Sequence, residues 1–501
     1  MQCRQRNLVS IQKVFIPFLI FAIAAFVYSQ YGFHGWLGRD EAVNLYSGQR
    51  MAQGVPPYVS IFVNQGPLAP MLAGLGVIVS KQLAWDDIYA VRLVFFIVSC
   101  LAVVSVYWLG NSLFQSQRVG GFAAFAFLGF FGFARHAAGS GPRTKTPMVL
   151  FETLSLLLTS QRQWFWAGLC GSLSSLAWQP TAIFPLVTLI LATARPREER
   201  FPAISRALAG IGLPLVVIGA YFHYHGAFYE LLDGAILFNI RYLDRVQYSF
   251  ISHISKVERA VFSGYGTMLL PIVIGLIMVV YIYFWRRSLH ESFRDTLTKD
   301  AFAPVLLSFP APVLWSLLDF QGYPDFYVFL PYLAIGFGKF LDLAVQHMER
   351  SRGTTLQEGA PRFLTTGLCI ALIASAWINV HVRRESRLDL QKQAAFEIEE
   401  RFGEDVRLLS IGAPEILVVL HRINPSPYVF IISGIDRRIH ANTPGGFEGW
   451  LQELEAYGPE VIAFGQTNGI HTYKLMDWLK SQYHEEHIGP WELYVRDSLG
   501  K

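Results

Sequence analysis

The chain has 501 residues, of which 52% are hydrophobic and only 16% are charged, and its mean hydropathy is +0.35. Soluble domains usually carry about 25% charged residues, so these values exclude an ordinary soluble protein and predict a membrane protein. The formal net charge of +4 is too small and too scattered for nucleic-acid binding. The four cysteines form no CxxC pair, so neither a zinc site nor a disulfide framework is indicated.

A series of apolar segments follows the basic N-terminal tail, and each approaches the length needed to cross a bilayer core of about 30 Å. We interpret the first as an uncleaved span rather than a signal peptide, because no small-x-small cleavage site follows it. The segments are 14–28, 67–80, 90–110, 119–135, 147–159, 163–178, 180–194, 203–222, 266–285, 301–318, 326–343 and 363–382.

Basic loops set the expected orientation. The loops at 195–206, 286–299 and 350–362 are rich in Lys and Arg, so the positive-inside rule places them in the cytoplasm with the N-terminal tail. An odd number of apolar segments lies between that tail and the first of these loops, so one segment does not cross. The weakest is 67–80, which is short and contains two prolines, and we interpret it as juxtamembrane or re-entrant.

This assignment predicts a mainly α, polytopic bundle of about eleven spans in the cytoplasmic membrane. Residues 1–382 would form the membrane module, with external loops at 29–91, 135–146 and 223–262. Residues 383–501 would form a small extracytoplasmic α/β domain, because short apolar runs alternate there with helical patterns. We expect strands at 408–411, 428–432 and 461–464, and helices at 415–422, 447–457 and 473–483.

The first external loop carries the most informative motif. Asp40 and Glu41 follow the first span, and after them come Tyr46, the sequence Gly54-Val-Pro-Pro-Tyr58 and then Gln65-Gly-Pro-Leu68. Later in the chain, Val91-Arg-Leu93 opens a span and Gly322-Tyr-Pro-Asp325 precedes another. Over about the first 345 residues this pattern resembles the GT-C superfamily, within it the protein mannosyltransferase-like and aminoarabinose transferase-like enzymes.

The resemblance implies a glycosyltransferase that moves a sugar from a polyprenyl-phosphate donor to an acceptor hydroxyl, with inversion at the anomeric carbon. The family's catalytic aspartate would fall on Asp40, which would accept the hydroxyl proton, with Glu41 as its neighbour or orienter. Taken alone, the pair would equally suit an acidic first turn of a surface helix. The implied partners are a polyprenyl-phosphate-linked sugar, membrane lipid, and an acceptor protein, glycolipid or glycan.

The leaving phosphate needs cationic and hydrogen-bonding groups rather than a proton. The second external loop supplies Arg135, His136, Arg143 and Lys145, although cations that snorkel from span ends would look the same. External loops are normally poor in such residues, which favours a binding role. We add three residues from the motif positions as substrate-binding candidates: Tyr58, Gln65 and Arg92.

The sequence departs from its relatives at two points. Many of them carry a second acid in the second external loop. The nearest acid here is Glu152, which lies inside a predicted span. Either Glu152 takes the place of that second acid, or this chain lacks the role. Gln65 stands where a lysine is expected. Histidines in 223–262 do not have metal-ligand spacing, and the external loops hold too few acids to predict a divalent metal or another cofactor. Two alternatives stay open: a polytopic lipid or glycan transporter or flippase, and a non-catalytic family member.

Overall fold

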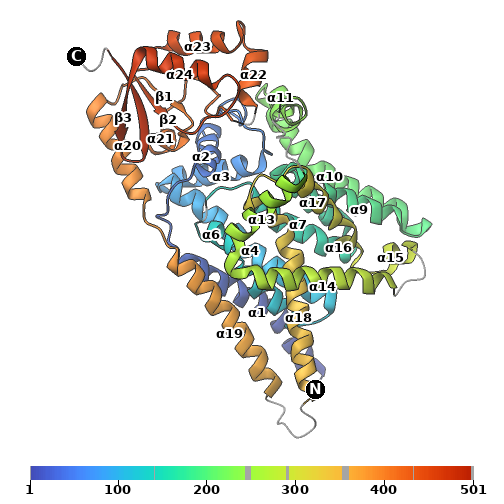
Figure 1. Cartoon of the computed structure of the whole chain (residues 1–501). Helices are drawn as coiled ribbons and strands as arrows, with labels where there is room; N and C mark the ends of the chain where they lie inside the picture. The colour runs from blue at the N-terminus through green and yellow to red at the C-terminus, as the bar shows by residue number, and fades with distance from the viewer. Residues whose placement is uncertain are drawn as a thin grey trace.

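The computed structural model describes residues 2–139, 141–242, 250–288, 293–351, 360–432 and 434–497. It consists of a helical bundle with a small α/β domain at one end (Figure 1). The N-terminus and the adjoining ends of α18 and α19 lie at the opposite end of the molecule from the C-terminal sheet (Figure 1). The expected class, a mainly α polytopic bundle with a C-terminal α/β domain, is therefore confirmed.

The bundle is built from helices of very different lengths. Those of its first half are α1 (Gln2–Ser29), α2 (Arg39–Met51), α3 (Leu68–Leu83), α4 (Asp87–Phe114), α5 (Gln117–Gly129), α6 (Phe131–Gly139), α7 (Lys145–Ser160), α8 (Trp164–Ala177), η1 (Gln179–Ala182), α9 (Ile183–Thr193) and α10 (Arg197–Tyr224). Those of its second half are α11 (Phe228–Leu232), η2 (Asp233–Leu237), α12 (Phe238–Arg241), α13 (Phe250–Tyr265), η3 (Gly266–Met268), α14 (Leu269–Ser288), α15 (Phe293–Lys299), α16 (Ala303–Ser308), α17 (Pro310–Leu318), η4 (Tyr323–Phe329), α18 (Leu330–Ser351) and α19 (Ala360–Val382).

Every apolar segment predicted from the sequence coincides with one or two of these helices. Within the described residues, 5 helices are long and apolar enough to cross a membrane, or up to 6 if the bent pair α5 and α6 is one span. That pair is bent by 72°. Four further apolar helices are shorter, among them Val14–Ser29 and Leu68–Leu83. The number of crossings therefore stays a prediction.

The segment expected not to cross, 67–80, is the helix α3. It packs closely against α2 and α4, because glycines remove the side chains that would keep the backbones apart. A Cβ on Gly48 would lie 2.7 Å from the backbone nitrogen of Gly74, and one on Gly76 would lie 2.8 Å from a methyl of Val91. Helices α2 and α3 thus form a pair that supports the first external loop.

The C-terminal domain has a four-stranded sheet of order β1-β2-β4-β3, in which β1 and β2 are parallel and the other pairs antiparallel. Its strands are β1 (Leu408–Ile411), β2 (Val461–Phe464), β3 (Tyr483–Ile488) and β4 (Trp491–Arg496). Its helices are α20 (Leu388–Phe402), α21 (Pro414–Val419), α22 (Ile435–Asn442), α23 (Gly446–Tyr457) and α24 (Thr472–Gln482).

The prediction of a strand at 428–432 is wrong. The backbone of this segment bonds to several different partners: the Val429 carbonyl accepts from Gly412 N at 2.6 Å, and the Ile431 carbonyl accepts from Asn468 N at 2.8 Å. No ladder forms, although the residues are apolar. Strands β3 and β4 were not predicted. β3 lies at the sheet edge, where exposed polar residues protect against pairing with other chains, and its central residues are His and Glu.

A single hydrophobic core joins the C-terminal domain to α2, α3 and the start of α4. Polar contacts cross the same junction. The backbone N–H of Asn424 donates to the Tyr46 hydroxyl at 3.0 Å, and that of Phe62 donates to the Pro427 carbonyl at 2.8 Å. The C-terminal domain is therefore packed directly against the loop that carries Asp40 and Glu41.

Two of the predicted cytoplasmic loops contact each other. The guanidinium groups of Arg195 and Arg162 both donate to the carbonyl of Thr298, at 2.9 and 3.1 Å. The loop at 195–206 and the segment at 293–299 therefore lie at the same end of the bundle, as the charge pattern predicts. Parts of the expected loops fall outside the described residues, namely 140, 243–249, 289–292 and 352–359.

Candidate active site

The acidic pair of the first external loop lies in the first turn of α2. The two side chains differ sharply in environment, since 67% of the Asp40 side chain is exposed against 10% for Glu41. The Glu41 carboxylate accepts from the backbone N–H of Gly38 at 3.4 Å, which satisfies one of the free donors at the helix start. Glu41 is thus fixed in the protein, whereas Asp40 faces outward.

Arg143, from the loop between α6 and α7, lies against both acids. Its Nε donates to Glu41 Oε1 at 3.1 Å, and its Nη1 lies 3.8 Å from Asp40 Oδ2. The loop is held in place by Asn44, which donates to the Pro142 carbonyl at 2.8 Å. Gly141 permits this approach, because a Cβ there would fall 2.1 Å from the Glu41 carboxyl carbon. The sequence-predicted acid and cation are therefore adjacent.

Electrostatics keep the Arg143 guanidinium charged. Burial opposes the charge, but the carboxylates of Glu41 and Asp40 outweigh it and raise the pKa of Arg143 above its ordinary value. A permanent cation 3.8 Å from an exposed carboxylate can stabilise negative charge that develops beside Asp40.

Arg92, at the start of α4, is 1% exposed and bonds to the backbone of the first external loop. It donates to the carbonyls of Phe33 and Gly35, the latter at 2.9 Å, and its Nη2 lies 4.0 Å from Glu41 Oε2. Through these hydrogen bonds, Arg92 stabilises the backbone of the first external loop. A direct contact with phosphate, as the sequence suggested, stays a prediction.

A small chamber of about 100 Å³ opens beside Arg143. We call it the carboxylate chamber; it is lined by Tyr31, Gly35, Trp36, Gly38, Glu41, Arg135, His136, Gly139, Arg143, Glu385 and Arg387. Arg135 is exposed here, and His136 is held by Tyr327 and by Tyr323, whose hydroxyl lies 3.0 Å from Nε2. Both second-loop candidates therefore reach the chamber.

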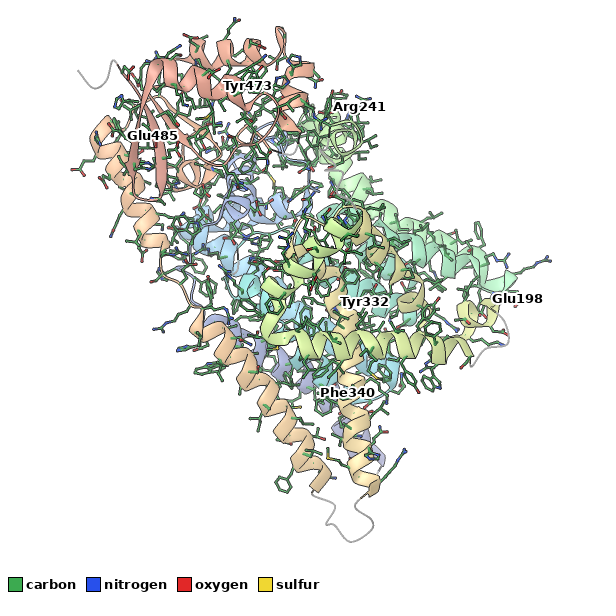
Figure 2. All side chains as sticks on the ribbon, in the orientation of Figure 1. Glu198, Arg241, Tyr332, Phe340, Tyr473 and Glu485 are labelled. Atoms are coloured by element: carbon green, nitrogen blue, oxygen red, sulfur yellow. The ribbon has the colours of Figure 1, made fainter. Side chains whose placement is uncertain are left out.

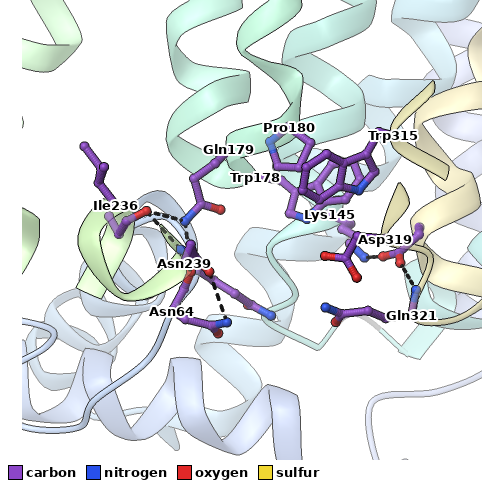
Figure 3. A pocket seen from close by; sticks show the side chains of 13 residues that line it. Asn64, Lys145, Trp178, Gln179, Pro180, Ile236, Asn239, Trp315, Asp319 and Gln321 are labelled. Carbon is purple, nitrogen blue, oxygen red and sulfur yellow. Dashed lines mark hydrogen bonds and ion pairs between the residues drawn. The ribbon is translucent and has the colours of Figure 1, made fainter. Parts of the chain in front are cut away.

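The other cation of the second loop, Lys145, belongs to a larger cavity of about 330 Å³. We call it the tryptophan cavity (Figure 3); it is lined by Asn64, Gln65, Lys145, Trp178, Gln179, Pro180, Ala235, Ile236, Asn239, Trp315, Asp319, Gln321 and Asp325. Lys145 forms an ion pair with Asp325 and lies 4.7 Å from the ring centre of Trp178. Only Thr144 separates Lys145 from Arg143 in the chain, so the same loop contributes one cation to each of the two spaces.

The two remaining first-loop candidates are joined to each other. The hydroxyl of Tyr58 donates to the backbone carbonyl of Gln65 at 2.7 Å, and Gln65 lines the tryptophan cavity. Tyr58 itself is 3% exposed, with a positive φ of 68°. Tyr58 therefore shapes the loop from within, while Gln65 faces the cavity.

Glu152 lies in α7 and is fully buried, and neither carboxylate oxygen has a hydrogen-bond partner among the described residues. It lines neither the carboxylate chamber nor the tryptophan cavity. The sequence-based suggestion that Glu152 serves as a second acid of the site thus stays a prediction, and the structure places it away from the other candidates.

Several residues of these two spaces were missed in the sequence. Glu385 and Arg387 come from the link between α19 and α20, and Glu385 accepts a hydrogen bond from Tyr31 at 3.1 Å. Trp178 and Trp315 meet edge to face, with ring centres 6.2 Å apart. These residues are far from the motif in sequence and belong to ordinary apolar or charged stretches, so no local signal marks them.

One further acid comes from the C-terminal domain. Glu415 begins α21, which packs on α2, and it is 8% exposed. Burial raises the pKa of its carboxyl to about 7, and the carboxylates of Asp40 and Glu41 act in the same direction, whereas Arg39 opposes them. Among the described residues, no group of three or more His, Cys, Asp or Glu side chains could hold a metal ion.

No family model and no curated protein sequence matches this chain. Solved structures do match in fold. ArnT from Cupriavidus metallidurans in the apo state is similar with a TM-score of 0.62 and 13% identity, over 96% of this chain and 98% of that one. Oligosaccharyltransferase AglB from Archaeoglobus fulgidus, in complex with an inhibitory peptide and a dolichol-phosphate, is similar with a TM-score of 0.51 and 13% identity, over 97% and 75%.

A second structure of the A. fulgidus enzyme, in complex with Zn and sulfate, has a TM-score of 0.55 and 14% identity, over 95% of this chain and 73% of that one. ArnT and AglB are both GT-C proteins. The chain therefore shares the fold of these proteins along nearly its whole length, as the resemblance in the first external loop predicts.

Proposed function

We propose that this chain is an integral membrane glycosyltransferase that moves a sugar from a polyprenyl-phosphate donor to an acceptor hydroxyl. The observation that carries the proposal is the exposed Asp40 carboxylate beside the charged guanidinium of Arg143, 3.8 Å away, within a GT-C fold. A base and a fixed cation side by side are what this reaction needs, because a proton leaves the acceptor while charge develops on the phosphate.

Asp40 is the proposed general base. It accepts the hydroxyl proton as the acceptor oxygen bonds to the anomeric carbon. The bond from that carbon to the phosphate oxygen breaks, and its electron pair leaves with the phosphate. Glu41 is less suited to this role, since its oxygens already bind Arg143 and the Gly38 N–H. We assign Glu41 the task of orienting Arg143. A single displacement of this kind inverts the anomeric centre.

The donor would occupy the space between Arg143 and Lys145. Arg143 and Arg135 stabilise the departing phosphate at the carboxylate chamber. The tryptophan cavity receives the sugar, because its two indole rings offer flat apolar walls and its amides offer hydrogen bonds to hydroxyls. The AglB structure, which contains a dolichol-phosphate, supports a lipid-phosphate donor for this fold. The acceptor is a protein, glycolipid or glycan.

The test is an assay of the purified full-length protein with polyprenyl-phosphate sugars and simple acceptors, beside the variant Asp40→Asn. We expect wild-type protein to release polyprenyl phosphate from at least one donor and to give an inverted product. Asp40→Asn should lower kcat by roughly 10²–10⁴-fold, the usual contribution of a general base. If no donor is consumed, while the protein moves intact lipid-linked sugar between leaflets of a vesicle, the chain is a flippase instead.

The proposal also fixes a topology in the cytoplasmic membrane. The N-terminus lies inside, whereas the site of the membrane module 1–382 and the domain 383–501 face outside. Reporter fusions at Gly139 and after Arg387 should both report the extracytoplasmic side. A cytoplasmic signal from either fusion contradicts this assignment.

A further inference from the structure

One wall of the tryptophan cavity is a short irregular helix held between the membrane bundle and the C-terminal domain. The wall consists of η2, a π-helical turn, and α12, and it contributes Ala235, Ile236 and Asn239 to the cavity. π-helical turns are rare and are frequently found at functional sites. Because such a turn is poorly stabilised by its own hydrogen bonds, its position depends on what lies on either side.

On the cavity side, two amide side chains donate hydrogen bonds to the same two backbone carbonyls, one in the first external loop and one in the wall. Gln179 Nε2 donates to the carbonyls of Asn64 and Ala235, at 2.9 and 3.0 Å. Asn239 Nδ2 donates to the same carbonyls, at 2.9 and 3.1 Å. Figure 3 shows these side chains meeting at one edge of the cavity. The first external loop, η1 and the wall therefore meet at a single point.

On the outer side, α22 of the C-terminal domain binds the wall through polar contacts. Arg438 Nε donates to Asp233 Oδ2 at 2.9 Å, its Nη2 binds the same oxygen, and its Nη1 donates to the Tyr428 hydroxyl. The guanidinium also lies 4.1 Å from the ring centre of Phe62. Both partners are largely buried, with 15% and 7% of their side chains exposed.

The rest of α22 extends the same contact. Arg437 donates to the Tyr242 carbonyl at 2.9 Å. Gly434, with φ of +90°, is required there, because a Cβ would fall 1.9 Å from that carbonyl oxygen. Figure 1 shows α11 and α22 side by side at the junction of the two parts, and Figure 2 places Arg241 at the same junction. Removing one partner of such a buried pair is costly, because the other charge is then left uncompensated.

We propose that Arg438 is a positioning residue for the donor: through Asp233 it fixes the π-helical wall of the tryptophan cavity, so that the C-terminal domain sets the shape of a site in the membrane module. Arg438 lines neither space and acts only through the wall. The proposal rests on the proposed function where it concerns donor use, and on the geometry alone where it concerns the wall.

The experiment uses the full-length variants Arg438→Gln, Asp233→Asn and their combination. Each single variant should raise KM for the polyprenyl-phosphate sugar about tenfold or more, because a small displacement of a binding wall is costly, with little change in kcat. The double variant should be no worse than either single one, since both remove the same link. Arg401→Gln is the matched control, because Arg401 pairs with Glu486 in the same domain but is half-exposed.

A second measurement does not depend on activity. Backbone amide exchange over 233–242 should be faster in Arg438→Gln, partly restored in Arg438→Lys, and unchanged in Arg401→Gln. Unchanged exchange in a folded Arg438→Gln protein overturns the proposal, and so does faster exchange with an unaltered donor KM. If the wild-type protein transfers no sugar, the proposed function fails. In that case, amide exchange over 233–242 and the binding of polyprenyl monophosphate are compared between the wild-type protein and Arg438→Gln. The two measurements together then decide whether Arg438 shapes the cavity.

Discussion

The ion pairs of the bundle are of two kinds, which differ in the distance along the chain that separates their partners. At the end that carries the C-terminal domain, three largely buried pairs join residues more than 100 positions apart: Arg143–Glu41, Lys145–Asp325 and Arg438–Asp233. At the other end, Arg118 likewise pairs with Asp342 and Glu349, 224 and 231 positions away, but the pairs Arg195–Glu199, Lys299–Asp295 and Lys339–Asp342 each lie within one helical turn.

The difference has a physical reason. A pair within one turn of a helix needs only the local backbone, and at least one partner is usually solvated, so such pairs contribute little. A buried pair between distant segments forms only when the whole fold brings both charges out of water together, and it is costly to break one side of it. Two of the three long-range pairs at the end with the C-terminal domain line the two spaces: Glu41 and Arg143 line the carboxylate chamber, and Lys145 and Asp325 line the tryptophan cavity.

The sharpest test of this comparison is to remove the charge of Arg143 in the carboxylate chamber. Arg143→Gln should lower kcat by roughly 10²–10³-fold, the usual effect of removing one fixed donor to a developing anion, whereas Arg195→Gln should leave kcat unchanged. The measurement is transfer of sugar by purified protein under saturating donor. A similar loss in both variants would mean that the two ends do not differ in function.

A smaller effect is expected on stability when the partner acid is removed. Glu41→Gln replaces the closest carboxylate of Arg143 with a neutral amide and leaves Asp40, 3.8 Å away, as its acidic partner. The free energy of unfolding should fall by about 2–3 kcal/mol, within the range for one side of a buried pair. Adding Arg143→Gln should recover part of that loss, because the largely buried cation that lost its closest partner is then removed as well. Thermal unfolding of the wild-type protein, the two single variants and the double variant gives the coupling energy between Glu41 and Arg143. Strictly additive losses would show that Glu41 and Arg143 do not act together.

The same contrast explains what the sequence could predict about the fold. Helices of the bundle are encoded by long apolar runs, so each predicted segment is found as helix. Strands β1 and β2 are short apolar runs and are found for the same reason. The segment 428–432 has the same composition, but its backbone bonds to separate segments, and only the assembled fold determines that. β3 was missed because its exposed positions carry charge.

For the site, the sequence identifies rare residues but not their partners. Asp40, Glu41 and Arg143 stand out because charges are scarce in this chain, and the structure brings them together. Arg92 carries the same signal, yet its guanidinium is engaged by backbone carbonyls, and residue type alone does not distinguish the two cases. Trp178, Glu385 and Glu415 reach the site through tertiary contacts, so their local sequence contains no sign of it.

The contact between the C-terminal domain and α2 should respond to pH through Glu415. Its folded pKa of about 7 lies above the ordinary value of about 4.3, so the folded state binds the proton more tightly. Its stabilising contribution is complete below pH of about 4.3 and is lost as pH rises through about 7, a change on the order of 3–4 kcal/mol. Glu415→Gln should flatten this part of the stability profile, measured by thermal unfolding between those pH values. An unchanged slope would show that Glu415 is not the titrating group.

The smallest effect belongs to the local pairs. Glu199→Gln removes the partner of Arg195, but Glu199 is 60% exposed, so water replaces the lost contact and Arg195 keeps its bond to the Thr298 carbonyl. We expect no measurable change in thermal unfolding, or in transfer at physiological salt, because an exposed pair within one helical turn is screened and solvated. Asp325→Asn, which removes the long-range partner of Lys145, is the matched comparison and should impair donor use. If Glu199→Gln proved as damaging as Asp325→Asn, separation along the chain would not be what distinguishes the two kinds of ion pair.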